Sequence, residues 1–391
     1  MKPPRIPVGQ GDHIVRVCVP ASGGAGERSE PEGVFADREA PSEPFGPTSP
    51  ATAGEDNAPD SAQSETNLIQ SLFAPLTLGH PASFGLHDDV AFLPTAATAG
   101  FVITQDQVIE GTHFLASDPI DWAARRLVRR NVSDLIAKGA RPRAAFLSLA
   151  WPKARPRSEM ADFAAGLGED LKHVCGNCPL LGGDTSTTDG PLVASLTLLG
   201  EMAGTRTSPV LRSGAQVRDR VLVTGAIGDS WLALQIRLGH MSASDGLEAC
   251  LKRATLPQTP PLALADLIAQ YANASIDVSD GLLADATHLA NQSGAALHLN
   301  LDCIPLSPEA HAWCDADPDQ SLPRRLLLAT GGDDYQPLLT LSPTHAQAFC
   351  AAAQALGVPV TDIGGVSAGK GLHLRFSDHA VPLPARLGWG T

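Results

Sequence analysis

The chain has 391 residues, of which 43% are hydrophobic, and a formal net charge of −14. This length exceeds what one hydrophobic core usually holds, so we expect two domains. The acidic excess argues against nucleic acid or an anionic membrane as a partner, and no apolar run is long enough to span a bilayer. The N-terminus lacks the apolar core of a secretory signal, which predicts a cytoplasmic protein.

The first segment, residues 1–64, is rich in Pro, Gly, Ala, Ser and Glu and has no sustained periodicity. Such a segment cannot bury enough apolar surface to offset its ordering entropy, so we expect a disordered, low-complexity extension. Strand-like and helix-like patterns then alternate, which is typical of α/β architecture. We expect a first α/β domain over 65–204 and a second over 205–391.

The predicted elements follow from these patterns in chain order. In the first domain they are a short helix near Leu68, strands over 85–93, 101–106 and 108–114, a helix over 121–139, a strand near 144–150, a helix near 159–174, and strands over 180–186 and 191–202. In the second they are a strand over 221–225, a helix after Gly228, a linker over 257–261, a strand leading from Ser275 into a helix that ends before Gly294, a strand over 297–301, a strand and turn over 326–335, and a strand over 337–341.

The helix over 121–139 is amphipathic, and Gly139 stands where a left-handed C-terminal cap belongs. Asn131 and Asp134 share one side of it, and Asp134 is flanked by two positions that we expect to be buried. A carboxylate at the border of an apolar face is costly unless a cation meets it. Taken alone, a solvated Asp at the helix edge is the simpler interpretation.

Four further acidic motifs favour a cation-binding role over a solvated Asp, although each motif could by itself be a turn or a cap. They stand at strand ends or helix edges, where α/β proteins place their sites, and Asp is a common ligand of Mg²⁺. If these carboxylates converge they require metal ions, because like charges raise one another's pKa. The motifs are Asp88-Asp89, Thr104-Gln105-Asp106, Gly182-Gly183-Asp184-Thr185 and Asp277-Val278-Ser279-Asp280.

Glycine doublets at Gly182-Gly183 and Gly331-Gly332 permit close backbone approach to a phosphate. No P-loop and no Rossmann glycine motif is present, so both of those nucleotide sites are disfavoured. Phosphate neutralisation would then depend on metal ions and an arginine. Arg212 is a candidate, and a surface arginine in a loop is an equally good interpretation.

The order of these motifs resembles the thiamine-monophosphate kinase family, within the aminoimidazole-ribotide-synthetase-like ATP-binding superfamily. The resemblance runs from about Glu65 to Trp389, and it is specific because six motifs occur in the right order. They are Asn131–Asp134 with Lys138–Ala140, Gly182–Thr185, Leu211–Gly214, Gly228–Ser230, Asp277–Leu283 and Gly331–Tyr335. The segment Glu110–Phe114 points to this family rather than its relatives.

The resemblance implies a two-domain α/β (α+β) architecture, with the N-terminal sheet contributing to a barrel across a homodimer. It implies transfer of a phosphoryl group from ATP to thiamine monophosphate, giving thiamine diphosphate, with Mg²⁺ as cofactor. Thiamine monophosphate would contact His113, Asp333 and Trp389. ATP would contact Gly183, Asp184, Arg212 and Ser279. The Mg²⁺ ligands would be Asp89, Thr104, Gln105, Asp106, Asp134, Asp184, Asp277 and Asp280.

Some positions depart from the family's pattern. Gln105 stands where Thr is usual, and would coordinate through its amide oxygen or its backbone; Asp333 is one methylene shorter than the usual Glu. Two alternatives therefore stay open: an enzyme of the same superfamily with another acceptor, or a catalytically weak nucleotide- and metal-binding protein. Simple packing could also account for His113 and Trp389.

Overall fold

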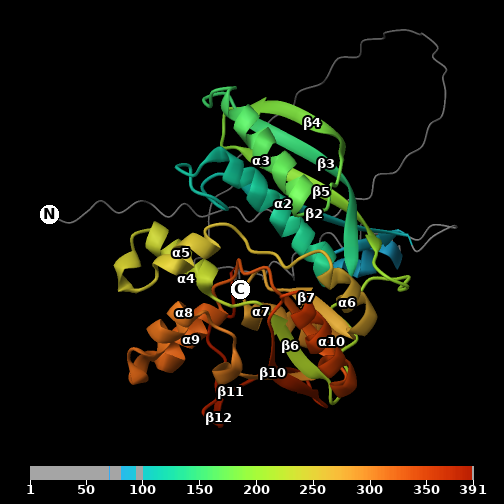
Figure 1. Ribbon diagram of the computed structural model, residues 1–391, viewed down its shortest axis with the longest axis vertical. Coiled ribbons are helices and arrows are strands. Elements are labelled where there is room, and N and C mark those ends of the chain that lie inside the picture. The colour runs from blue at the N-terminus through green and yellow to red at the C-terminus, as the bar shows by residue number, and fades with distance from the viewer. Residues whose placement is uncertain (1–69, 71–80, 94–99, 390–391) are drawn as a thin grey trace, which may run out of the picture.

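The computed structural model describes residue 70, residues 81–93 and residues 100–389, which form two sheets and the helices that cover them (Figure 1). The expected extension over 1–64 and the helix near Leu68 lie outside the described residues. Within the described part of the chain, no helix combines the length and apolar character needed to cross a membrane.

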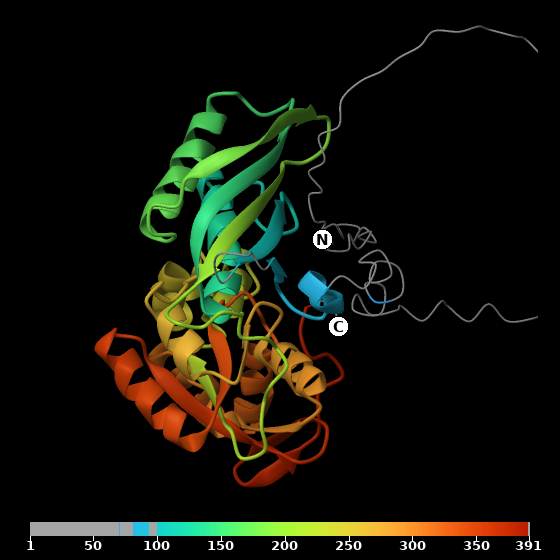
Figure 2. The same cartoon turned by 90° about the vertical axis from the view of Figure 1, so that its right-hand side faces the viewer.

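The first sheet has five strands in the order β1-β2-β5-β3-β4, and only β3 and β4 pair in parallel. Two helices, α2 and α3, lie against one face of it (Figure 2), because alternate residues of β5 are buried toward them. The bounds are β1 Ala91–Leu93, β2 Phe101–Ile109, α2 Ile120–Ala137, β3 Ala140–Pro152, α3 Glu159–His173, β4 Leu180–Thr188 and β5 Val193–Met202.

The second sheet has seven strands in the order β12-β11-β8-β10-β6-β9-β7, and only β8 and β11 pair in parallel. Its strands are β6 Arg220–Thr224, β7 Ala274–Asp277, β8 Ala296–Asn300, β9 Pro337–Leu341, β10 Val360–Ser367, β11 Gly371–Phe376 and β12 His379–Val381. The helices here are α4 Asp229–Arg237, α5 Glu248–Ala254, α6 Leu264–Tyr271, α7 Leu282–Ser293, α8 Pro308–Asp315, α9 Ser321–Ala329 and α10 Pro343–Ala355.

The helix α2 is the element that both halves of the molecule share. One side packs on the first sheet, while its C-terminal part contacts α6, β7 and β9 of the second half (Figure 1). Apolar residues of α2 such as Leu127 and Leu135 are fully buried in this core, which contributes about 2 kcal/mol for each leucine. Gly139 adopts the predicted left-handed conformation just beyond the helix. Functional residues on α2 therefore face both domains.

Two of the expected strands are wrong, and a third is much shorter than expected: Pro81–Leu86 form a 3₁₀-helix, and only Ala91–Leu93 of the expected strand over 85–93 is extended. The segment 108–114 is no separate strand, because β2 runs unbroken to Ile109 and the chain then turns, with the Gly111 N–H donating to the Phe114 carbonyl at 2.8 Å. Residues Leu326–Ala329 belong to the helix α9, whose Leu328 is buried beside an exposed Leu327. A short apolar run does not distinguish a buried strand from part of a helix.

Candidate active site

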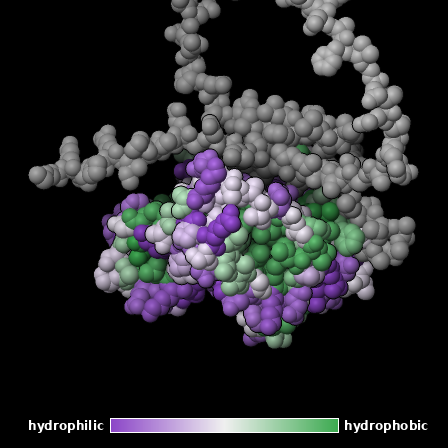
Figure 3. Space-filling view, turned by 90° about the horizontal axis from the view of Figure 1, so that it is seen from above, coloured by the Kyte–Doolittle hydropathy of each residue, from purple (hydrophilic) through white to green (hydrophobic). Residues whose placement is uncertain are grey.

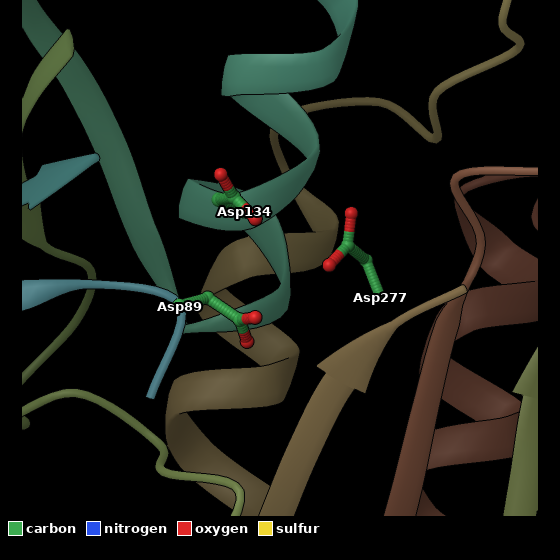
Figure 4. A group of neighbouring side chains, drawn as sticks. All are labelled: Asp89, Asp134 and Asp277. Carbon is green, nitrogen blue, oxygen red and sulfur yellow. The ribbon is translucent and has the colours of Figure 1, made fainter. Parts of the chain in front are cut away.

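Three carboxylates from distant parts of the chain meet between the two halves of the molecule. Asp89 precedes β1, Asp134 lies in the last turn of α2, and Asp277 ends β7. One oxygen from each lies within 4.8 Å of the other two, and Figure 4 shows the side chains gathered around a common space. The structure thus brings together three of the predicted metal ligands, and such an oxygen-only set suits a hard cation such as Mg²⁺.

The strand β2 adds polar groups to this cluster. The Thr104 hydroxyl donates to Asp134 Oδ2 at 2.5 Å, and the Asp106 N–H donates to Asn131 Oδ1 at 3.0 Å. Side chains alternate along a strand, so Gln105 points to the opposite face and is exposed. Its amide oxygen is therefore directed away from the cluster, which leaves the backbone as its possible contribution.

Burial controls the charge state of Asp277. Burial raises the pKa of this carboxyl, and the nearby Asp106 carboxylate raises it further. The Ser133 hydroxyl, which donates to Asp277 Oδ2 at 2.6 Å, lowers the pKa and so partly offsets burial, as does the charge of Lys138. A divalent cation among these carboxylates would favour the ionised form of Asp277, so the residues present fit a metal ion.

Two cations also border the cluster. The fully buried Lys138 Nζ lies 2.7 Å from Asp89 Oδ2 and 3.2 Å from Asp88 Oδ1. The Arg212 guanidinium pairs with Asp89, and the Arg212 N–H donates to Asp88 Oδ2 at 2.8 Å. The arginine singled out in the sequence thus lies at the cluster, whereas no role for Lys138 was inferred from the sequence. Its position directly before Gly139, at the buried end of α2, is the signal that could have indicated one.

A cavity of about 260 Å³ lies beside the cluster, between α2, α4, the loop 331–335 and the C-terminal segment. The three residues implied for thiamine monophosphate, His113, Asp333 and Trp389, all line it. Ser279 and Asp280 line it too. Because Asp277 belongs to the cluster, the motif Asp277–Asp280 connects the cluster to the cavity.

Local hydrogen bonds shape the cavity wall formed by the turn 279–281. The Asp285 Oδ2 atom accepts from the N–H groups of Ser279, Asp280 and Gly281 at 3.0, 3.1 and 3.2 Å, which holds this turn against the first turn of α7. A Cβ on Gly332, whose φ is +73°, would lie 2.7 Å from the Ser279 carbonyl oxygen. Only glycine therefore lets the loop 331–335 lie directly against this turn.

Trp389 is fixed at the cavity rim by two hydrogen bonds. Its backbone N–H donates to the Asp280 carbonyl at 2.9 Å, and its indole Nε1–H donates to the Gly331 carbonyl at 2.7 Å. The side chain of Arg386 lies 5.6 Å from the ring centroid, and Trp389 remains 55% exposed. The ring thus lines the cavity while part of its surface stays exposed, and its contact with a substrate stays a prediction.

His113 has a defined tautomer. Its Nδ1 accepts the backbone N–H of Ile109 at 3.1 Å, so the proton of the neutral imidazole is on Nε2. The Nε2–H group is then a hydrogen-bond donor on a residue that lines the cavity.

Gly183 and Asp184 lie apart from this site within one chain. They are exposed on β4, an edge strand separated from β2 by β5 and β3. Three strand spacings place β4 about 14 Å from β2. The expectation that Asp184 gathers with Asp89, Asp106 and Asp134 is therefore not met in the single chain.

Two arginines that were not considered in the sequence analysis, Arg126 and Arg130, also line the cavity. Helix α2 contains two pairs of adjacent arginines, at positions 125–126 and 129–130. Residues four apart lie on the same side of a helix, so each arginine of the first pair shares a side with one of the second. Arg125 and Arg129 both pair with Asp170 of α3, whereas the other two face the cavity. The spacing was visible in the sequence, but which pair faced a site was not.

Comparison with known proteins agrees with this geometry. The family models for the N-terminal and C-terminal domains of AIR synthase related protein match residues 87–202 and 216–377. The thiamine-monophosphate kinase of Caulobacter vibrioides is 43% identical over 325 residues, covering 83% of this chain and 90% of that protein. This chain belongs to the thiamine-monophosphate kinase family.

Further members of the thiamine-monophosphate kinase family resemble the chain over most of its length. The kinase of Aquifex aeolicus is 33% identical over 276 residues, covering 69% of this chain and 83% of that protein. A solved structure of AaThiL complexed with AMPPCP and TMP superposes with a TM-score of 0.69 and 29% identity, over 83% of this chain and 96% of that one. The resemblance and the two-domain fold expected from the sequence are both confirmed.

Proposed function

We propose that this protein transfers the γ-phosphoryl group of ATP to the phosphate of thiamine monophosphate, giving thiamine diphosphate. The observation that carries the proposal is that the motif Asp277–Asp280 connects the carboxylate cluster to a cavity lined by His113, Asp333 and Trp389. Relatives of this chain are named thiamine-monophosphate kinases, and one solved relative is described as complexed with AMPPCP and TMP.

The proposed Mg²⁺ site has Asp89, Asp134 and Asp277 at its centre. Bound Mg²⁺ would neutralise phosphate charge during transfer. The remaining proposed ligands in the same chain are Thr104 and Asp106 on β2, Gln105 through its backbone, and Asp280 at the cavity. Asp184 on β4 is too far from the cluster within one chain, so it is proposed as a ligand only across the homodimer.

The chain's own residues would bind and orient the two anions. Arg212, which already meets the cluster at Asp89, would hold the ATP phosphates. Ser279 and the exposed backbone at Gly183-Asp184 are further proposed ATP contacts. No residue has to remove a proton from the acceptor, since a phosphate oxygen is already largely ionised at neutral pH. Catalysis then consists mainly of in-line positioning and charge neutralisation.

A direct assay tests the proposed reaction. The full chain is incubated with ATP, Mg²⁺ and thiamine monophosphate, and the products are separated by anion-exchange chromatography. Thiamine diphosphate is expected. Tight binding of ATP and Mg²⁺ by calorimetry without any product would overturn the proposal in favour of a nucleotide-binding protein, and product from another phosphorylated acceptor alone would favour a different enzyme.

The replacement Trp389→Ala is expected to raise KM for thiamine monophosphate by about tenfold or more and to leave KM for ATP unchanged. A cationic thiazolium ring that covers the indole and excludes water from the contact gains about 2 kcal/mol, and alanine removes that contact. Initial rates at varied concentrations of each substrate measure the effect. Trp389→Phe is the matched control, because it keeps an aromatic face and should lose much less; an equal loss in both variants would contradict stacking.

We also propose a homodimer in which the first sheet forms a barrel with its partner. The face of this sheet opposite α2 and α3 exposes Phe146 beside the edge strand β4, which carries the exposed Leu180 and Leu181. Seen from above, the surface shows apolar areas beside hydrophilic ones (Figure 3). Apolar side chains on an edge strand favour association with another sheet.

The replacement Leu181→Asp is expected to convert the dimer to monomer at micromolar concentration. Leu181 is 62% exposed in the single chain, so the charge costs little there but would be buried in the dimer. Sedimentation velocity measures the change. Leu238→Asp, which alters an exposed leucine just after α4, should leave the dimer intact, and a monomeric wild-type protein would contradict the proposal.

The cytoplasm is the proposed location. Every cysteine in residues 100–389 is a free thiol, as is usual in a reducing compartment. The net charge of −14 also makes a nucleic-acid partner an unfavourable one.

A further inference from the structure

The cavity has two cationic side chains on one wall. Arg126 and Arg130 lie one turn apart on α2, and only 8% and 7% of these residues is exposed. A guanidinium in so buried a position is costly unless an anion meets it. Each of these two arginines therefore requires an anion close to its guanidinium.

Arg126 is matched within the protein. It pairs with Asp333 and donates to the Thr255 carbonyl at 3.1 Å. A third arginine of the cavity, Arg237, pairs in the same way with Asp118. The charges of Arg126 and Arg237 are thus each paired with a carboxylate of the chain.

Arg130 also pairs with a carboxylate of the chain, but that carboxylate, Asp106, belongs to the proposed metal site. Its guanidinium lies 3.5 Å from Asp106 Oδ1, at the outer limit of a hydrogen bond, and 5.9 Å from the centroid of the Tyr335 ring. Asp106 in turn shares a face of β2 with Thr104, whose hydroxyl donates to Asp134 of the cluster at 2.5 Å. Arg130 therefore stands at the junction, with the carboxylate cluster on one side and the cavity on the other.

We propose that Arg130 is the residue that binds the phosphate of the acceptor. This assignment rests on the proposed function, which needs an acceptor phosphate between the cluster and the cavity. The planar guanidinium can give two parallel hydrogen bonds to a phosphate. The cavity then recognises an acceptor with an anionic end at Arg130 and a cationic aromatic end at Trp389.

Binding without turnover tests the assignment. Calorimetry in the absence of ATP compares thiamine monophosphate with thiamine, which lacks the phosphate, on the wild type and on Arg130→Ala. The variant is expected to lose between about tenfold and a hundredfold in affinity for thiamine monophosphate, the range for a hydrogen bond to a charged group, and less than about twofold for thiamine. The affinity of Arg130→Lys for thiamine monophosphate should lie between those of the wild type and Arg130→Ala. The lysine ammonium keeps the charge attraction but cannot give two parallel hydrogen bonds to the phosphate.

The control is Arg129→Ala, on the same helix, whose guanidinium faces Asp170 of α3 and should leave both affinities unchanged. Melting temperatures confirm that each variant is folded, and Arg130→Lys serves if Arg130→Ala is not. An equal loss for both ligands, or no loss for thiamine monophosphate, overturns the role of Arg130 while the proposed function stands. A wild-type protein that binds neither ligand overturns the proposed function itself.

Discussion

Replacing Asp134 by Asn is expected to lower kcat by about a hundredfold or more, with little change in melting temperature. Asp134 accepts the Thr104 hydroxyl at 2.5 Å and faces Asp89 and Asp277. Asparagine keeps the size and one acceptor oxygen but removes the negative charge. A metal ion contributes several kcal/mol of charge stabilisation in the transition state, and each 1.36 kcal/mol lost lowers the rate tenfold.

The measurement is the steady-state rate of thiamine diphosphate formation over a range of Mg²⁺ concentrations. The concentration of Mg²⁺ that gives half-maximal rate should also rise. The control is Asp162→Asn, the same change at an exposed position of α3, which should behave as the wild type. Turnover near the wild-type value at saturating Mg²⁺ would remove Asp134 from the proposed metal site.

Replacing Lys138 by Met is expected to lower the free energy of unfolding, and this is the second large effect. Lys138 is fully buried and lies within 3.2 Å of both Asp88 and Asp89, and it donates to the Ser275 carbonyl at 2.7 Å. Methionine fills a similar space without charge. Removing one partner of a buried ion pair typically costs about 3–5 kcal/mol, because the remaining charge is left uncompensated.

Thermal melting with and without Mg²⁺ measures this effect. A cation that binds only the folded state stabilises it, and in the variant the two aspartates have lost one of the two cations that border them. Mg²⁺ should therefore raise the melting temperature more in Lys138→Met than in the wild type. Lys172→Met, at an exposed position of α3, is the matched control. A variant as stable as the wild type without Mg²⁺ would mean that Lys138 contributes no net stability.

One helix connects these effects. Along α2, Arg130 faces the cavity, Ser133 contacts Asp277, Asp134 belongs to the cluster, and Lys138 follows the helix directly. With a rise of 1.5 Å per residue, Arg130 and Asp134 are separated by about 6 Å along the axis. A rigid helix therefore fixes the spacing between the proposed metal site and the proposed acceptor site.

The sequence by itself determined the local features of this protein. Apolar periodicity predicted α2, and Gly139 predicted its end, because both depend on neighbours within one or two turns. The spaced acidic motifs and glycine doublets were sufficient to indicate the family, since they are read along the chain without knowing which strands pair. The run at Leu326 was assigned wrongly because three apolar residues carry too little periodicity.

Only the tertiary structure decided which distant residues meet. Asp89, Asp134 and Asp277 converge because α2 packs against both sheets, whereas strand order leaves Asp184 on a far edge. The same packing turned Arg130 toward the cavity and Arg129 toward α3. Contacts of this kind depend on sheet order and on the meeting of two domains. Both are set by burial summed over the whole chain, and no local pattern of residues encodes them.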